Sequence, residues 1–345
     1  MEMDERKIKI LQAIINDYIN TAEPVGSRTI AKKYELGISS ATIRNEMADL
    51  EEMGYLEQLH SSSGRKPSNK GYRLYVDKLM QIPSLTPEEQ YRIKTQILDT
   101  ALYEVDRVIK QATSLLSELT KLTCIVKTPS VGKSSIKHIQ LINIDTNNIL
   151  LVIITDSGII KNNVIRVGKN VTGDALVKLN NILNARVRSL NCEQINLEVI
   201  NNLRMDLEGY EDIFSAIIPV LYESLSKSDS NEIYTEGTTN IFNYPEYKDI
   251  DKARDFLSLL DNKDKIVDLL SNSDNFSIRI GSENYVQGAQ DCSVVSAVYS
   301  LNNRPLGEIG VIGPTRIPYS KVISLLTSVV RELNYILTHI YFDDR

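Results

Sequence analysis

Tryptophan is absent from the 345-residue chain, and cysteine and histidine are rare, with three of each. The cysteines are far apart and form no Cys-x-x-Cys pair: Cys124, Cys192 and Cys292. This spacing argues against a zinc site or a disulfide framework and indicates thiols in a reducing compartment. The histidines are equally isolated, so no metal site and no Ser-His-Asp arrangement is expected. The sequence therefore predicts no metal, no cofactor and no enzymatic activity.

Long hydrophobic runs are also missing. The longest, such as residues 149–154, have the length of a β-strand, and no window approaches the roughly 18 apolar residues that a membrane helix needs. The first residues are acidic and are not followed by a long apolar run, so no signal peptide is expected. These absences predict a cytoplasmic protein.

Excess charge of either sign is missing from the N-terminal 80 residues, where acidic and basic side chains are equal in number. The rest of the chain carries the whole net charge of −6. Overall acidity therefore does not exclude binding to nucleic acid, provided that the attracting charge is local.

The N-terminal sequence has the order of elements of a winged helix-turn-helix, a module that reads DNA. Its segments are distinguished by helical apolar spacing, serine caps and a basic, acid-free hairpin. The expected elements are helix 7–20, helix 28–34 capped by Ser27, a third helix capped by Ser39, strand 55–60 and a hairpin tip over 61–67.

In the third helix, Ile43, Met47 and Leu50 form one apolar stripe, which leaves the opposite face to solvent or a ligand. In this module the first turns of the third helix touch base edges in the major groove. Asn45 is suited to an adenine edge, and Arg44 to guanine or a phosphate.

The remaining expected DNA contacts surround this face. Ala41 is suited to a thymine methyl group, and hydroxyls at the helix N-terminus are suited to phosphate oxygens. The window 58–73 has four basic residues and no acidic one, so its Arg65-Lys66 tip is expected to hold phosphates. Acidic residues from Asp49 onward should limit insertion of the helix. The complete expected set is Ser27, Arg28, Ser39, Ser40, Ala41, Thr42, Arg44, Asn45, Ser63, Gly64, Arg65, Lys66 and Lys70.

Beyond a proline-rich linker at 82–87, the pattern predicts a long helix over 88–122 and then mixed strands and helices. The segment 227–275 is polar, with one helical patch at 253–270. We expect the strand and helix units before 205 and after 275 to share one sheet, with the polar middle as an insertion.

Three motifs extend this interpretation to a family: residues 38–47, Ser63 to Ser68 with 71–73, and the segment 312–319, which contains Gly-Pro-x-Arg-x-x-Tyr. Together they resemble the heat-inducible transcription repressor HrcA of bacteria, over essentially the whole length. The resemblance implies an α+β multidomain fold. It consists of a winged helix-turn-helix over 1–82, a GAF-like α/β domain over 88–205 and 273–345, and a dimerisation domain inserted at 206–272.

The resemblance also implies a function: repression of the GroE and DnaK chaperone operons by binding an inverted-repeat operator called CIRCE. A homodimer is implied, because a two-fold dimer presents two recognition helices to two half-sites. The chaperonin GroEL is implied as a second partner that helps to keep the repressor active.

Two alternatives remain. The GAF-like domain could bind a small-molecule effector that gates DNA binding, or the winged helix could be an accessory of a metabolic enzyme, although no catalytic constellation is visible. The turn 313–316 has two interpretations as well. Arg316 either contacts an anion or effector, or it ties the turn to the sheet or the neighbouring helix; we favour the tie.

Overall fold

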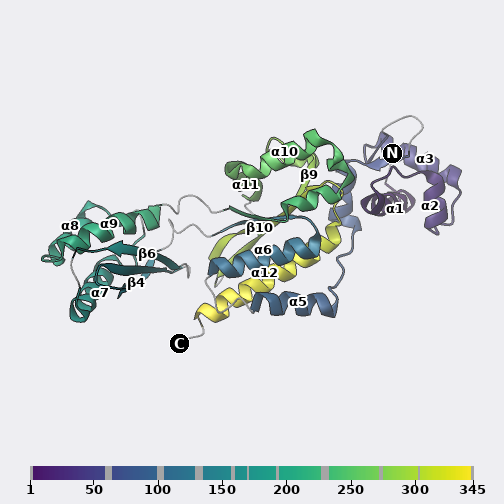
Figure 1. The fold of residues 1–345 in the computed structure, drawn as a ribbon. Helices are drawn as coiled ribbons and strands as arrows, with labels where there is room; N and C mark the ends of the chain where they lie inside the picture. Colours follow the sequence, from purple (N-terminus) through teal and green to yellow (C-terminus); the bar gives the residue numbers. More distant parts are fainter. Residues whose placement is uncertain are drawn as a thin grey trace.

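A computed structural model describes residues 3–58, 64–98, 105–128, 135–156, 160–168, 171–191, 194–226, 233–271, 275–301 and 304–342. Within them the fold mixes helices and antiparallel sheets. Figure 1 shows three units, with the N-terminal helices and the α7–α9 unit at opposite ends of a central sheet. No helix in this described part combines the length and the apolarity needed to cross a membrane.

The N-terminal unit is a winged helix-turn-helix. Its elements are α1 (Glu5–Thr21), α2 (Ser27–Lys33), α3 (Ser40–Glu52), β1 (Leu56–Glu57), β2 (Lys66–Pro67), α4 (Asn69–Leu74) and the π-helical turn η1 (Tyr75–Leu79). The side chains of Asp4, Ser39 and Ser68 each accept a backbone N–H in the first turn of the helix that follows. Ser27 does not cap α2 as expected. Gly26 occupies the cap position, and Ser27 is the first helical residue.

The central unit is built on a five-stranded antiparallel sheet in the order β7-β3-β10-β9-β8. The strands are β3 (Thr123–Lys127), β7 (Ile233–Glu236), β8 (Phe276–Ile280), β9 (Cys292–Leu301) and β10 (Arg304–Pro314). One face is covered by α6 (Val105–Thr120) and α12 (Tyr319–Phe342), with α5 (Pro87–Leu98) against α12. The other face is covered by α10 (Ile250–Asp261) and α11 (Lys263–Leu270). Figure 1 shows these two helical layers on either side of the sheet.

Short turns link the central elements: η5 (Thr238–Asn243) and η6 (Pro245–Lys248) precede α10, and η7 (Gly281–Glu283) follows β8. Alternate residues of the central strands enter two different cores. Val126, Val295 and Val311 face α6 and α12, whereas Ile125 and Val294 face α10 and α11. Because strand side chains alternate between faces, a sheet covered on both sides is apolar throughout.

The third unit has its own hydrophobic core. Its three-stranded sheet has the order β4-β5-β6, formed by β4 (Ile136–Asn143), β5 (Asn148–Thr155) and β6 (Ile160–Arg166). Helices α7 (Gly173–Val187), α8 (Leu197–Asp206) and α9 (Glu211–Ser226) cover one face. Strands β5 and β6 pair antiparallel and are consecutive in the chain, with Ile154 opposite Ile160.

The sheet arrangement differs from the expectation that 88–205 and 273–345 would share a sheet around an insertion at 206–272. Among the described strands, β4, β5 and β6 pair with one another and not with the central sheet, whereas residues 233–270, within the expected insertion, pair with or pack on the central sheet. The self-contained segment runs from 135 to 226. In place of one expected helix over 88–122, the described residues show two helices that pack on each other, α5 up to Leu98 and α6 from Val105. Residues 99–104 of that prediction lie outside the described residues.

The winged helix and the central unit share one continuous core. Residues of α1, α3 and α4 belong to the same cluster of buried side chains as residues of α6, α12 and the central sheet. The winged helix is therefore packed on the central unit rather than connected only through the linker.

Candidate nucleic-acid interface

The N-terminus of α3 is organised by its own hydroxyl groups. Oγ of Ser39 accepts the backbone N–H of Thr42 at 3.1 Å and lies 3.0 Å from Oγ1 of Thr42. Since both hydroxyls already have local partners, their first role is to fix the start of the helix. The first-turn N–H groups and the hydroxyl of half-buried Ser40 lie at the same end.

The outward face of α3 matches the face expected from the sequence. Ile43, Met47 and Leu50 are at most 4% exposed, whereas Arg44 and Asn45 lie on the surface beside Ala41, which is also exposed. Within the described residues, neither the guanidinium of Arg44 nor the amide of Asn45 has a hydrogen-bond or ion-pair partner. Both groups are available to a ligand in the solvent.

Two acidic residues of α3, Glu46 and Asp49, are paired with cations of α1. Nζ of Lys7 lies 2.9 Å from Oε2 of Glu46 and 3.1 Å from Oδ2 of Asp49, and Arg6 lies 3.4 Å from the other oxygen of Glu46. Bonds to Glu46 and then to Asp49 raise the pKa of Lys7 above its ordinary value. Sequence reasoning missed this role of Lys7, which joins α1 to α3 and offsets the negative charge nearest the recognition face.

Arg65 lies at the base of the wing. Its backbone N–H and C=O both bond to Val25, and its Nε donates to Oε2 of Glu51 at 2.7 Å. A Cβ on Gly64 would lie 2.5 Å from the carbonyl oxygen of Val25, so glycine is needed there for contact between two protein segments. Gly64 is an expected DNA contact, but packing against Val25 within the protein already accounts for a glycine at this position. Ser63 lies outside the described residues.

The other basic residues of the window 58–73 also have internal partners. Lys66 lies 3.2 Å from Glu57, and Nζ of Lys70 donates to the carbonyl of Met53 at 2.9 Å. The same ammonium sits 4.5 Å from the centre of the Tyr55 ring. Local attraction for phosphates is therefore weaker in the described part of the wing than the sequence indicates.

Helix α2 presents basic groups that are not internally paired. Arg28 and Lys32 are exposed, are four residues apart and so lie on one face of the helix, and have no partner among the described residues. Sequence reasoning included Arg28 with Ser27 but missed Lys32, although the i, i+4 spacing was visible. Together with Arg44, these side chains supply the unpaired positive charge beside α3.

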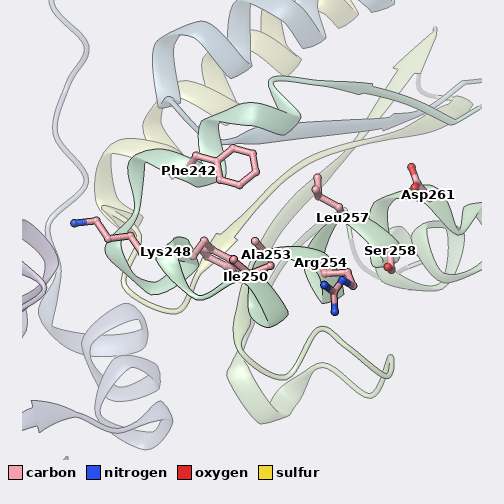
Figure 2. A pocket seen from close by; sticks show the side chains of 9 residues that line it. Phe242, Lys248, Ile250, Ala253, Arg254, Leu257, Ser258 and Asp261 are labelled. Carbon is pink, nitrogen blue, oxygen red and sulfur yellow. The ribbon is translucent and has the colours of Figure 1, made fainter.

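The central unit has a surface depression of about 640 Å³ along α10, and Figure 2 shows Phe242, Ile250 and Leu257 among its lining side chains. Two basic residues, Lys248 and Arg254, line it, and Arg254 is exposed and bonded to Asp251. No group of three His, Cys, Asp or Glu residues in the described ranges could hold a metal ion. Cys124 and Cys292 are buried, and burial raises the pKa of Cys292 to about 11.

Comparison with known proteins gives two family matches. Residues 2–79 match the model described as "Winged helix-turn-helix transcription repressor, HrcA DNA-binding", and residues 106–323 match the "HrcA protein C terminal domain". Among curated relatives, the heat-inducible transcription repressor HrcA of Clostridium acetobutylicum is 64% identical over 335 residues, which is 97% of each chain. The HrcA of Clostridium tetani is 60% identical over 338 residues, covering 98% of this chain and 96% of the relative.

One solved structure has the same overall fold. The crystal structure of a hypothetical protein superposes with a TM-score of 0.75 at 21% identity, covering 98% of this chain and all of the other. At this level of identity the likeness concerns the fold alone.

Proposed function

Since the chain belongs to the HrcA family of heat-inducible, DNA-binding transcription repressors, we propose that it binds an inverted-repeat operator of the CIRCE type as a homodimer. By that binding it would repress chaperone operons. The role is regulatory rather than enzymatic, as the names of the relatives indicate. The observation that supports operator reading most directly is the outward face of α3, where Arg44 and Asn45 are exposed and unpaired.

The proposed contacts divide by chemistry. Asn45 and Arg44 read base edges from the first turns of α3, and Ala41 packs on a thymine methyl. Arg28, with Ser27 and the α3 N-terminus at Ser39, Ser40 and Thr42, binds phosphates, because the helix before the recognition helix crosses the DNA backbone. Lys66, Lys70, Arg65, Gly64 and Ser63 form the proposed wing contacts. The paired cations Arg65, Lys66 and Lys70 would first have to leave or share their protein partners.

Homodimer formation is supported by an uncovered apolar surface on the three-stranded sheet. Ile142, Leu150 and Val164 are neighbours across β4, β5 and β6, on the face opposite α7–α9. Ile142 is 46% exposed and Val164 is 61% exposed. A second copy of the chain is the proposed occupant, because an inverted repeat needs two recognition helices related by a two-fold axis.

One edge of this sheet, at β4, is closed by side chains of α7. The side-chain amide of Asn184 bonds to both the N–H and the C=O of Ile139, and Asn180 does the same at Leu141. These bonds occupy backbone groups of β4 that a further strand would need. Association through strand addition at β4 is therefore disfavoured.

For the central unit we propose a GAF-like domain, formed by its five-stranded antiparallel sheet with helices on both faces. GroEL is the second proposed partner, supported by family membership alone. Adding purified GroEL to the operator-binding assay tests that partnership, since an unchanged affinity and an unchanged active fraction of repressor would argue against it.

Operator reading is tested by fluorescence anisotropy with two duplexes of equal length and composition, one carrying the inverted repeat and one scrambled. The chain should bind the inverted repeat at least 10³-fold more tightly, as specific DNA-binding proteins typically do. Asn45→Ala should remove roughly 1–3 kcal/mol of that discrimination. Equal affinity of the unmodified chain for both duplexes would contradict the proposal.

A further inference from the structure

The turn between β10 and α12, residues 313–318, reaches the winged helix. Nη1 of Arg316 donates to the backbone carbonyl of Ile19 in the last turns of α1, at 2.9 Å. The other two nitrogens of the same guanidinium bond to the carboxylate of Glu246 in η6, with Nη2 at 3.1 Å. Arg316 is 7% exposed, and its guanidinium lies 5.2 Å from the centre of the Tyr244 ring.

These bonds decide between the two interpretations of the turn. Each nitrogen of the Arg316 guanidinium already has a protein acceptor, and burial leaves no open side for an anion. Arg316 therefore acts as a tie. Its partners are the winged helix and η6, whereas we had expected the sheet or the neighbouring helix.

An aromatic contact lies next to this tie. The rings of Tyr72 in α4 and Tyr319 in α12 have centres 5.8 Å apart at an angle of 49°, and both are buried. The hydroxyl of Tyr319 is held at 2.6 Å by Oγ of Ser293 and also donates to the carbonyl of Thr315. The motif Gly-Pro-x-Arg-x-x-Tyr thus supplies two side chains to one interdomain contact.

A second arginine crosses the boundary in the opposite direction. Arg73 of α4 donates from Nε to Oε1 of Glu283 at 2.8 Å, pairs with the other oxygen, and donates to the carbonyl of Ile278 at 2.6 Å. Glu283 is itself fixed by the backbone N–H of Ile280 at 2.8 Å. Two-point arginine–carboxylate pairs constrain orientation as well as distance.

The two arginines hold α1 and α4 but leave α3 untouched. The recognition face, with Arg44 and Asn45, points into solvent while the rest of its domain is fixed to the central sheet. This arrangement fixes the orientation of α3 relative to the central unit. In a dimer, that orientation determines whether both copies of α3 can enter successive major grooves at the same time.

We propose that Arg316 and Arg73 are positioning residues for operator recognition, which fix the orientation of the recognition helix without touching DNA. The proposal rests on the proposed binding of a dimer to two half-sites, because orientation matters only when both sites must be occupied at once. Loosening either tie should cost affinity for the complete operator and spare binding to one half-site.

The test compares Arg316→Gln with Arg254→Gln, a matched change at an exposed arginine of α10. The affinity of each variant is measured for a duplex with the whole inverted repeat and for a duplex with one half-site. Arg316→Gln should weaken binding to the whole operator roughly 10-fold, within the range seen for residues that carry coupling between sites. Binding to the half-site and the behaviour of Arg254→Gln should stay within about twofold of the unmodified chain.

Hydrogen exchange supplies a readout on the protein itself. Exchange should rise in α1 and α4 of Arg316→Gln, with no change in β4, β5 and β6. If Arg316→Gln does not fold, Glu283→Gln takes its place, since it removes the charge that holds Arg73 from the central side. An equal loss on both duplexes, or no loss on either, would overturn the positioning role. If the unmodified chain does not prefer two half-sites to one, the dimer proposal fails instead.

Discussion

Nε of Arg65 lies 2.7 Å from Oε2 of Glu51, so the base of the wing is bonded to the last turn of α3. The two side chains are 19% and 32% exposed. A cation that the sequence assigns to DNA thus has a carboxylate partner within the protein. Its contribution to DNA binding and its contribution to the shape of the domain can be separated by experiment.

Arg28→Ala and Arg65→Ala should differ in the salt dependence of operator binding. Arg28 is unpaired, so its loss should lower the slope of log K against log salt by about 0.9 for each phosphate contact removed. Arg65→Ala should lower that slope by less, because Arg65 must first leave or share Glu51, and it should also lower the melting temperature of the domain. Anisotropy titrations across a salt series and thermal melts measure both. A larger change of slope for Arg65→Ala would show that Arg65 leaves Glu51 to bind DNA.

Gly71 and Gly173 form a second contrasting pair. A Cβ on Gly71 would lie 2.3 Å from the carbonyl oxygen of Tyr55, whereas nothing lies within 4 Å of the corresponding position at Gly173. Gly71→Ala should therefore destabilise the chain by about 1–3 kcal/mol, as overpacking does. Gly173→Ala, in the first turn of α7, should be neutral or stabilising by up to about 1 kcal/mol. Urea unfolding measures both, and equal stability of the two variants would contradict the close contact at Gly71.

Much of the interface follows from local rules. The apolar stripe of Ile43, Met47 and Leu50 identifies the outward face of α3, and the caps at Ser39 and Ser68 need only the residues within one turn. The partner of Arg65 could not be found this way, because Glu51 is 14 residues distant and becomes a neighbour only through the hairpin.

The grouping of strands could not be predicted for a similar reason. Periodicity identifies β3 and β4 equally well, but it carries no information on which strands they pair with. The polar composition of 227–275 suggested a separate unit. The structure shows exposed faces on α10 and α11 instead, with Phe256 and Leu269 buried on the central sheet. The sequence pattern also does not predict the short strand β7, which lies in this polar segment, or helix α8, which precedes it.

Glu89 should give a pH-dependent contribution to stability. Lys321, with Nζ 2.5 Å from Oε1, and the backbone N–H of Thr86 hold the pKa of Glu89 below its ordinary value of 4.5. A lowered pKa in the folded state stabilises the fold above pH 4.5, and this contribution is lost as the pH falls through the folded value.

Glu89→Gln should therefore lower the free energy of unfolding at pH 7 by up to about 1 kcal/mol, a partly exposed pair being screened by solvent. The difference from the unmodified chain should vanish as the pH falls well below 4.5. Glu88→Gln is the control, since Glu88 is exposed and has no side-chain partner among the described residues. A loss in Glu89→Gln that is the same at pH 3 and pH 7 would rule out the ion pair as its cause.

Val164 and Val177 offer a matched test of the proposed dimer surface, because each is 61% exposed and they lie on opposite sides of the same unit. Val164 is on the uncovered face of the sheet, opposite Leu150, and Val177 is on the outer side of α7. Burying a lysine ammonium in an apolar interface without a partner is strongly unfavourable. Val164→Lys should therefore shift the chain from dimer to monomer in light scattering, whereas Val177→Lys should leave it dimeric. Dissociation by Val177→Lys, or a stable Val164→Lys dimer, would place the interface elsewhere.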